Sequence, residues 1–199
     1  MTENGLDNIC HLSYDSMIAC CWKKGDAMKL RRIRAEEETV LRQLMQYYFY
    51  DFSAYNDADV LPDGRYGEYP NLERYWEPDS GHHPYFIEAN NGLAGFALVS
   101  VEDNKGTPRY VMSEFFVMRK YRSQGIGSAA ACSLFDAYPG RWIVTQIKRN
   151  APARAFWRKV IADYTGNQYT EHEEPNKIVQ SFTASHPSIT EGADSSDCT

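Results

Sequence analysis

A glycine pair between a strand-like and a helix-like segment is the first place in this sequence where chemistry is expected. The run Arg122-Ser123-Gln124-Gly125-Ile126-Gly127-Ser128 follows the basic residues Arg119 and Lys120. Glycine lets the backbone approach a phosphate closely, and the unpaired amides and dipole of a helix N-terminus attract negative charge. The residues therefore indicate an anion site. A Gly-x-Gly turn serves equally as a tight strand-to-helix connection in any α/β protein, and both interpretations stay open at this point.

Two well-known phosphate loops do not fit this turn. No Gly-Lys-Ser or Gly-Lys-Thr follows the glycines, as the ATP-binding P-loop requires. The third glycine of the dinucleotide fingerprint is replaced by Ala130. That fingerprint also belongs early in a series of alternating strands and helices, whereas this glycine pair follows a meander of strands. Neither ATP nor NAD is the expected ligand.

The elements that must position this turn are predicted from hydrophobic periodicity. Strands are predicted over 28–34, 84–89, 93–101, 110–118, 141–147, 164–169 and 177–182, and helices over 35–49, 125–138 and 151–161. Asn90-Asn91-Gly92 predicts a hairpin turn. Residues 51–80 break into Gly, Pro, Asn and Asp and predict a long loop with one short helix at 71–76. The order predicts a mixed α/β fold of the α+β class.

Composition bounds the remaining possibilities. The chain has 199 residues, 43% of them hydrophobic, which suits one well-filled core. A net charge of −6 with scattered basic residues argues against nucleic acid as a partner. No apolar stretch is long enough to span a membrane and no secretory signal is recognised, so a soluble, cytoplasmic protein without a membrane partner is expected. The five cysteines are odd in number and lack metal-ligand spacing, so neither a disulfide framework nor a metal site is expected.

The two ends of the chain differ from its centre. Residues 1–27 show no sustained periodicity, and we expect them to be a disordered or non-native extension before a domain that starts near Met28. Residues 184–199 are too polar to bury a core, and a disordered tail is expected there. One folded domain is therefore predicted over 28–183.

Two motifs in the right order resemble one enzyme family. The run from Phe115 to Ser128 resembles the acetyl-CoA signature of the GNAT N-acetyltransferases: Arg or Gln, two residues, Gly, one residue, then Gly or Ala. The run from Asn150 to Lys159 is similar to the family's second conserved helix, Asn-x-x-Ala-x-x-Phe-Tyr. The resemblance covers Met28 to about Phe182. It implies a single domain with a central twisted, mostly antiparallel sheet of six to seven strands flanked by helices.

The same resemblance implies acetyl-CoA as the acyl donor and names the residues that hold it. The strand that pairs with the pantetheine arm and the turn that cradles the pyrophosphate supply most of them, and Asn150 holds the arm through its side-chain amide. Asn150 equally suits a helix N-cap, which does not exclude that role. The expected set is Phe116, Val117, Met118, Arg122, Ser123, Gln124, Gly125, Ile126, Gly127, Ser128, Asn150, Ala153 and Phe156.

Acetyl transfer to an amine also needs a proton acceptor, because a primary alkyl amine has a pKa of roughly 10.4 and is protonated at neutral pH. Glu114, just before the pantetheine strand, is the candidate catalytic base, although a carboxylate on an alternating strand is more often solvated or salt-bridged. A backbone N–H near 116–118 is the candidate oxyanion donor. Trp157 stands where the family often has a Tyr, so the general acid is unassigned; Tyr164 and Tyr121 are the substitutes considered.

The acceptor is inferred from two acidic segments. Residues 51–85 are acidic and aromatic, and Glu171-His172-Glu173-Glu174 adds further charge. Carboxylates with aromatic faces suit a small cationic amine, while an ordinary solvated acidic surface explains them equally well. The expected function is N-acetyl transfer to such an amine in a ternary complex. The alternatives are a non-catalytic acyl-CoA-binding module and a protein or peptide N-acetyltransferase. A homodimer is expected only by analogy.

Overall fold

The fold is seen in a computed structural model that describes residues 28–104 and 106–185. The expectations for residues 1–27 and for the tail after 185 lie outside the described residues. The helices and strands of the described residues begin with Lys29 and end with Ala184.

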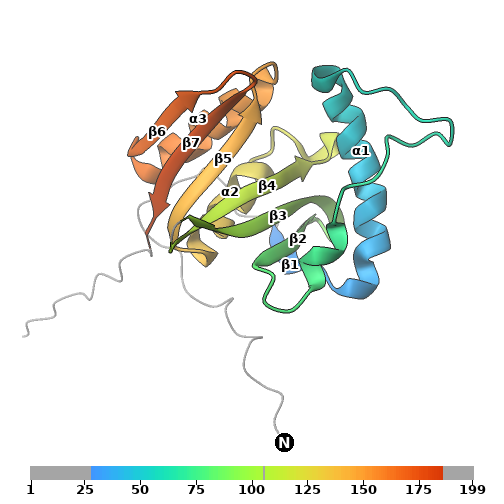
Figure 1. The fold of residues 1–199 in the computed structure, drawn as a ribbon, viewed down its shortest axis with the longest axis horizontal. Helices are drawn as coiled ribbons and strands as arrows, with labels where there is room; N and C mark the ends of the chain where they lie inside the picture. The colour runs from blue at the N-terminus through green and yellow to red at the C-terminus, as the bar shows by residue number, and fades with distance from the viewer. Residues whose placement is uncertain (1–27, 105, 186–199) are drawn as a thin grey trace, which may run out of the picture.

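A seven-stranded sheet forms the centre of the molecule, in the order β1-β2-β3-β4-β5-β7-β6 (Figure 1). Its strands are β1 (Lys29–Arg32), β2 (His82–Ala89), β3 (Gly92–Asn104), β4 (Thr107–Val117), β5 (Gly140–Ile147), β6 (Tyr169–Glu173) and β7 (Lys177–Ala184). All neighbouring strands are antiparallel except β4 and β5. The fold is therefore the predicted mixed, mostly antiparallel one.

Helices cover both faces of this sheet. On one face lies α1 (Glu38–Asn56), preceded by the 3₁₀ turn η1 (Ala35–Glu37), together with η2 (Leu72–Trp76). These elements pack on β2, β3 and β4 through residues such as Leu41, Phe96 and Phe116. On the other face lie α2 (Ile126–Ala137), which η3 (Arg119–Tyr121) precedes, and α3 (Ala151–Thr165). No helix in the described residues is both long and apolar enough to cross a bilayer.

A bulge in β4 changes which side chains face α1. Leu98 pairs with Glu114 and Val99 with Met112, so Ser113 is the extra residue. Such a bulge shifts the alternation of side chains by one residue. Met112 lies in the cluster under α2 and α3, whereas Glu114 contacts Tyr48 of α1. With strict alternation, Glu114 would lie on the same face as Met112. The bulge places its carboxylate on the α1 face instead.

Beyond the bulge, β4 separates from β5. The two parallel strands pair only between residues 110–112 and 142–144, whereas β5 pairs with β7 along its whole length. Residues 113–117 of β4 therefore present one backbone edge without a neighbouring strand. Figure 1 shows the sheet as two halves that meet at β4 and β5.

Several boundaries differ from the sequence predictions. The helix predicted to end at Phe49 continues to Asn56, and its added turns place Asp51 against arginines of another segment. The strand predicted over 164–169 is wrong: α3 continues to Thr165, ends at Gly166 in the left-handed conformation, and β6 starts at Tyr169. The hairpin turn is confirmed, with Asn90 at φ 51° and Asn91 at φ 58°.

Candidate active site

The free edge of β4 carries backbone groups that point away from β3. The Met118 N–H donates to the Ala94 carbonyl across β3 and β4. In an antiparallel ladder these directions alternate, so the N–H and C=O of Phe115 and Val117 point to the open side. The Val117 carbonyl confirms this direction, because it accepts a 2.7 Å hydrogen bond from the Arg122 Nε rather than from a strand. Phe116, Val117 and Met118, named from the sequence, therefore lie at the separation of the two strands.

The glycine turn follows directly. Ser123 and Gly125 both have positive φ angles, 59° and 81°, and Gly125 is the N-cap of α2. No side chain caps this helix N-terminus. The first amides of α2, including those of Gly127 and Ser128, therefore face outward without a side-chain acceptor, as an anion site requires. Ser123, Gln124 and Gly125 are exposed, while Ile126 is buried beneath them and anchors the turn.

Gly127 marks where the turn meets α3. A Cβ atom at this position would lie 3.3 Å from the Phe156 ring and 3.5 Å from a Val117 methyl group. The absence of a side chain thus lets the two predicted motifs touch. Asn150 is the N-cap of α3 and accepts a 3.0 Å hydrogen bond from the Ala153 N–H. Its N-cap role is therefore observed, and its amide nitrogen is not used in that bond.

Asp51 holds the basic residues of the turn. Its carboxylate, at 18% side-chain exposure, accepts hydrogen bonds from Arg119 at 2.8 Å and from Arg122. Because Arg122 also bonds the Val117 carbonyl, its guanidinium joins α1, the end of β4 and the turn. The sequence argument treated Arg122 as attraction for a phosphate and missed this partner, which only the longer helix α1 brings into range.

Glu114 is the central acidic side chain of the site. Its carboxyl lies between β4 and α1, where the Tyr48 hydroxyl donates a 2.5 Å hydrogen bond to it. Burial raises the pKa of Glu114, because a charged carboxylate loses its hydration there, and the hydroxyls of Tyr48 and Tyr69 partly oppose that rise. Glu114 is not the solvated strand carboxylate that the sequence left open. Its environment is that of a tuned acid or base.

Three tyrosines surround this carboxyl. Burial raises the pKa of Tyr48 and of Tyr69, and the nearby Glu114 charge adds to the effect. Tyr75 interacts with Tyr69 and with Ser113, and Ser113 in turn contacts Ser100 at 2.8 Å. Tyr48 lies in the helix predicted over 35–49 from hydrophobic periodicity, and Tyr69 and Tyr75 lie in the segment 51–80 predicted as a long loop with one short helix. Their hydroxyls converge only because the β4 bulge and η2 bring three distant segments together.

The residues considered as general acid lie in other surroundings. Trp157 is 6% exposed and packs against Phe115 and Phe135 in the core. The Tyr164 hydroxyl donates to Asp136 at 2.8 Å. Tyr121 is buried in the cluster below α2. The structure thus gives these residues packing or pairing roles and does not assign an acid.

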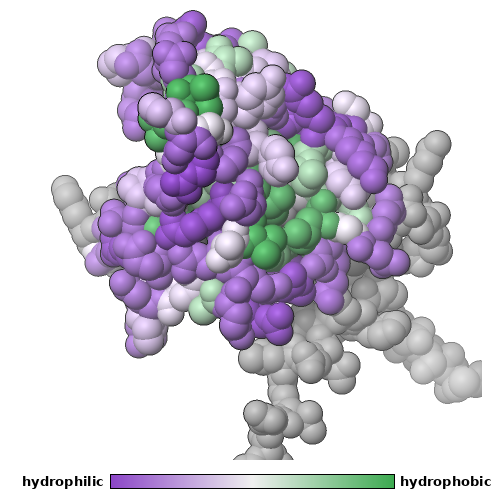
Figure 2. Space-filling view, turned by 90° about the vertical axis from the view of Figure 1, so that its right-hand side faces the viewer, coloured by the Kyte–Doolittle hydropathy of each residue, from purple (hydrophilic) through white to green (hydrophobic). Residues whose placement is uncertain are grey.

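Many carboxylates of the acidic segments are already paired. In residues 51–79, the arginine-bound ones are Asp51, Asp57, Asp63 and Glu68. Glu171, Glu173 and Glu174 of the last hairpin bond to Arg158, Lys148 and Lys177. Figure 2 views the side on which α1 lies, and apolar areas are set there among mostly hydrophilic residues. The acid of these segments thus serves in large part to hold the structure.

The histidine pair has a structural environment. His83 stacks on Tyr138 at 4.9 Å and contacts Arg32 at 2.7 Å. Burial and the Arg32 charge lower the pKa of His83 to about 4. Among the described residues, no group of three or more His, Cys, Asp or Glu side chains is placed to hold a metal ion.

Comparison with known proteins now adds to this geometry. Among solved structures, the fold is similar to a putative GNAT acetyltransferase of Desulfovibrio desulfuricans, with a TM-score of 0.54 and 16% identity over 80% of this chain and 100% of the other. It is also similar to the PaiA N-acetyltransferase of Thermoplasma acidophilum in complex with coenzyme A, with a TM-score of 0.54 and 12% identity over 79% and 99%. A third is the ribosomal-protein-S18-alanine N-acetyltransferase of Escherichia coli, with a TM-score of 0.50 and 14% identity over 82% and 98%.

At these identities the structural matches show the fold alone. A comparison with curated protein sequences found no significant match. The sequence profile described as the acetyltransferase (GNAT) family matches residues 41–161, which is more than half of the chain and includes Glu114, the glycine turn and the Asn150 helix. The chain therefore belongs to the GNAT acetyltransferase family.

Proposed function

We propose that this protein transfers an acetyl group from acetyl-CoA to the primary amine of a small cationic acceptor. The observation that carries the proposal is the position of Glu114. This buried carboxyl with a raised pKa lies on β4 beside the free strand edge, and that edge leads directly into an uncapped helix N-terminus with two glycines. A candidate base, a free strand edge and a candidate anion cradle thus follow one another along a single stretch of chain.

The donor side fits acetyl-CoA. The exposed turn of Ser123, Gln124 and Gly125 and the first amides of α2 would take the pyrophosphate. The pantetheine arm would lie along the free edge of β4, where the Val117 N–H has no strand partner. Asn150 would bond the arm through its amide nitrogen, since its oxygen already caps α3.

On the acceptor side, Glu114 takes the proton that the amine must lose. Its raised pKa brings it nearer to neutral pH, where proton transfer is most efficient. Tyr48 fixes the carboxyl in place from α1. A backbone N–H of the free β4 edge is the candidate donor to the oxyanion that attack on the thioester creates. The departing thiol has an intrinsic pKa of about 8.5, so it leaves as a thiolate without a dedicated acid.

A small acceptor is favoured over an extended peptide by the segment after α1. Residues 57–71, which we name the acidic loop, are held against α1 by Gln46 and Arg42. A loop fixed in this way leaves less room for an extended chain beside Glu114. The aromatic rings of Tyr48, Tyr69 and Tyr75 suit a cation, because an ammonium group is attracted to aromatic faces.

Calorimetric titration with acetyl-CoA tests the donor site. Gly125→Asp adds a side chain and a negative charge at the cradle, and we expect it to weaken micromolar binding at least about tenfold. Gly166→Asp is the matched control: Gly166 also has a positive φ, 60°, and a Cβ there meets nothing within 4 Å. This control should bind as the wild type does. Gly127 is left unchanged because its substitution would press on Phe156.

Turnover with a panel of amines and peptides then tests the reaction. Acetylation of small amines that falls by about two or more powers of ten in Glu114→Gln supports the proposal. Acetyl-CoA binding without turnover on any acceptor would instead favour the non-catalytic acyl-CoA-binding module. Efficient acetylation of peptides alone would favour the peptide acetyltransferase. If the wild type does not bind acetyl-CoA, the proposal is wrong.

A further inference from the structure

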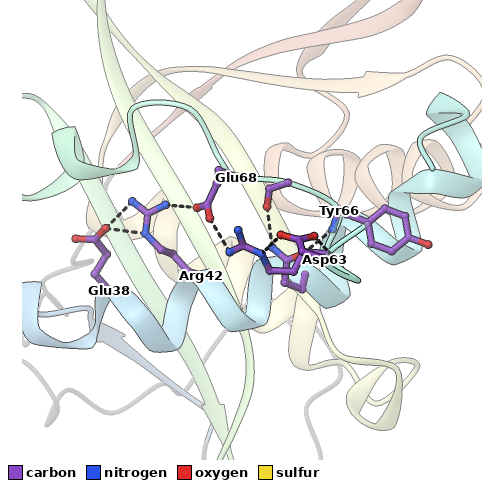
Figure 3. Close-up of polar contacts among 8 residues, drawn as sticks. Glu38, Arg42, Asp63, Tyr66 and Glu68 are labelled. Carbon is purple, nitrogen blue, oxygen red and sulfur yellow. Dashed lines mark hydrogen bonds and ion pairs between the residues drawn. The ribbon is translucent and has the colours of Figure 1, made fainter. Parts of the chain in front are cut away.

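The acidic loop is fastened to α1 by one carboxamide. The Gln46 Nε2 donates to the Gly67 carbonyl at 2.9 Å, and the Gln46 Oε1 accepts from the Tyr66 N–H at 2.8 Å. Figure 3 shows Tyr66 of the loop beside the helix. The side-chain amide thus bonds the N–H of one loop residue and the C=O of the next, so that both of its polar ends hold the loop backbone. A carboxamide offers an N–H donor and a C=O acceptor on one side chain, and Gln46 uses both here.

A series of ion pairs also connects the acidic loop to α1, one helical turn before Gln46. Arg42, four residues before Gln46, bonds Glu38 at 2.8 Å and Glu68 at 2.7 Å. Glu68 also accepts from Arg65 at 2.7 Å, and Arg65 bonds Asp63 at 3.0 Å (Figure 3). These pairs are mostly exposed, and exposed pairs contribute little stability individually. The partly buried amide contacts of Gln46 are therefore the stronger fastening.

The hydrogen bonds of Gln46 to the loop affect the position of Tyr69. Tyr69 follows Gly67 by two residues and packs in the cluster between α1 and the sheet. Its hydroxyl interacts with the Glu114 carboxyl, as that of Tyr48 does. The groups that face this carboxyl are Tyr48 from α1, Tyr69 from the acidic loop and Tyr75 from η2. Of these, Tyr69 is the one that lies in the acidic loop itself, two residues after the Gln46 contact at Gly67.

We propose that Gln46 is a positioning residue that sets Tyr69 against Glu114 by holding Tyr66 and Gly67 on α1. Gln46 touches neither the carboxyl nor the expected substrate, and it acts through the backbone of the loop. This inference deepens the proposed function, on which its kinetic part rests. Its structural part stands on the contacts alone and is tested without turnover.

Gln46→Met tests the inference, because methionine has nearly the same length and makes neither hydrogen bond. Gln43→Met is the matched control, an exposed position of the same helix. Trypsin cuts after Arg65, inside the fastened loop. Loss of two hydrogen bonds predicts about 5- to 100-fold faster cleavage at Arg65 in Gln46→Met, with Gln43→Met equal to wild type. Circular dichroism verifies that both variants are folded.

The pH titration of the Glu114 carboxyl carbon, followed by NMR and assigned through Glu114→Gln, provides the second measurement. The Tyr69 hydroxyl lowers the pKa of Glu114. We therefore expect a higher Glu114 pKa in Gln46→Met and in Tyr69→Phe, and no further rise when the two are combined. Gln43→Met should titrate as the wild type does.

Each outcome decides between the claims. Unchanged cleavage at Arg65, or an unchanged Glu114 titration, in Gln46→Met would overturn the inference. Additive shifts in the double variant would also overturn it, because Gln46 would then act by another route. If both measurements move as expected but no variant, including the wild type, acetylates an amine, the positioning role stands and the proposed function fails. If the wild type is active, Gln46→Met should lower kcat/KM for the amine with unchanged acetyl-CoA affinity.

Discussion

Tyr48 and Glu114 lie 66 positions apart in the chain and meet at 2.5 Å between α1 and β4. The hydroxyl comes from a helix face that otherwise packs apolar side chains on the sheet, and the carboxyl comes from a strand whose alternation a bulge has shifted. Tyr48 faces the sheet in a regular helix, whereas Glu114 faces Tyr48 because of the bulge in β4. Their contact ties the candidate base to the helix that precedes the acidic loop.

Replacing Glu114 by Gln should lower the activity of the protein and raise its stability. We expect kcat/KM to fall by about two to four powers of ten, because proton acceptance is lost. The raised pKa means that the protonated carboxyl is favoured in the folded state. Its stabilising contribution is present below the ordinary pKa of 4.5 and is lost as pH rises through the folded value. Gln stays neutral, so the variant should melt at a higher temperature than wild type at pH 7.

That stability difference should shrink below pH 4.5, where the wild-type carboxyl is protonated in both states. Thermal melts at several pH values check it. If Glu114→Gln is as active as the wild type, Glu114 is not the base of the reaction.

Replacing Tyr48 by Phe should move the pH dependence of the reaction. The Tyr48 hydroxyl lowers the pKa of Glu114, so its removal should raise that pKa further. The acidic limb of the kcat/KM profile should then shift to higher pH. Stability should also fall by about 1–3 kcal/mol, since a hydrogen bond to a charged group is lost. If Tyr48→Phe gives the same pH profile of kcat/KM as the wild type in the same buffers, the pKa of Glu114 does not determine the acidic limb.

Gly95 should not tolerate a side chain. A Cβ atom there would lie 1.9 Å from the Phe116 carbonyl oxygen, in the strand pair next to the free edge of β4. We expect Gly95→Ala to destabilise the fold by about 3 kcal/mol or more, because backbone must move. Gly166→Ala, in open space at φ 60°, should cost only about 1–2 kcal/mol. Urea unfolding of both variants makes the comparison; equal losses would contradict the close approach.

The stability of the protein should fall in mild acid through His83. Its folded pKa of about 4 lies below its ordinary value of 6.5, because burial and Arg32 disfavour the charged ring. The unfolded chain therefore takes up the proton first, and stability is lost as pH falls from 6.5 toward 4. His83→Asn cannot take up that proton and should lose less stability over this window. Urea midpoints at pH 7 and pH 5 for both proteins provide the measurement.

The sequence predicted the sheet and the cradle because their signals are local. Alternating apolar residues mark the strands, and the two asparagines before Gly92 determine the hairpin turn. The turn near Gly125 needs a positive φ angle, which glycine favours. The proposed donor side could therefore be predicted from one stretch of chain, which the structure places at the separation of β4 and β5.

The acceptor side could not be predicted in the same way, since it depends on contacts between distant segments. The network around Glu114 needs the bulge at Ser113, which no residue type announces. Tyr48 occupies an apolar helical position, so its hydroxyl carried no separate signal. At the end of α3 the local signal in the sequence is misleading, because the aromatic residues between 164 and 169 are typical of a strand. In the structure Tyr164 packs on Phe135 as part of α3, and the helix ends at Gly166 in the left-handed conformation.

The short pairing of β4 with β5 has a consequence for how the molecule responds to its donor. Three residue pairs form the seam between the two halves of the sheet, and the ion pair of Asp57 with Arg149 links α1 to the segment before α3. A ligand that lay along the open edge of β4 would take the place of a missing strand. Amide hydrogen exchange at Phe115 and Val117 would then slow on binding, and the donor itself would serve as a structural part of the sheet.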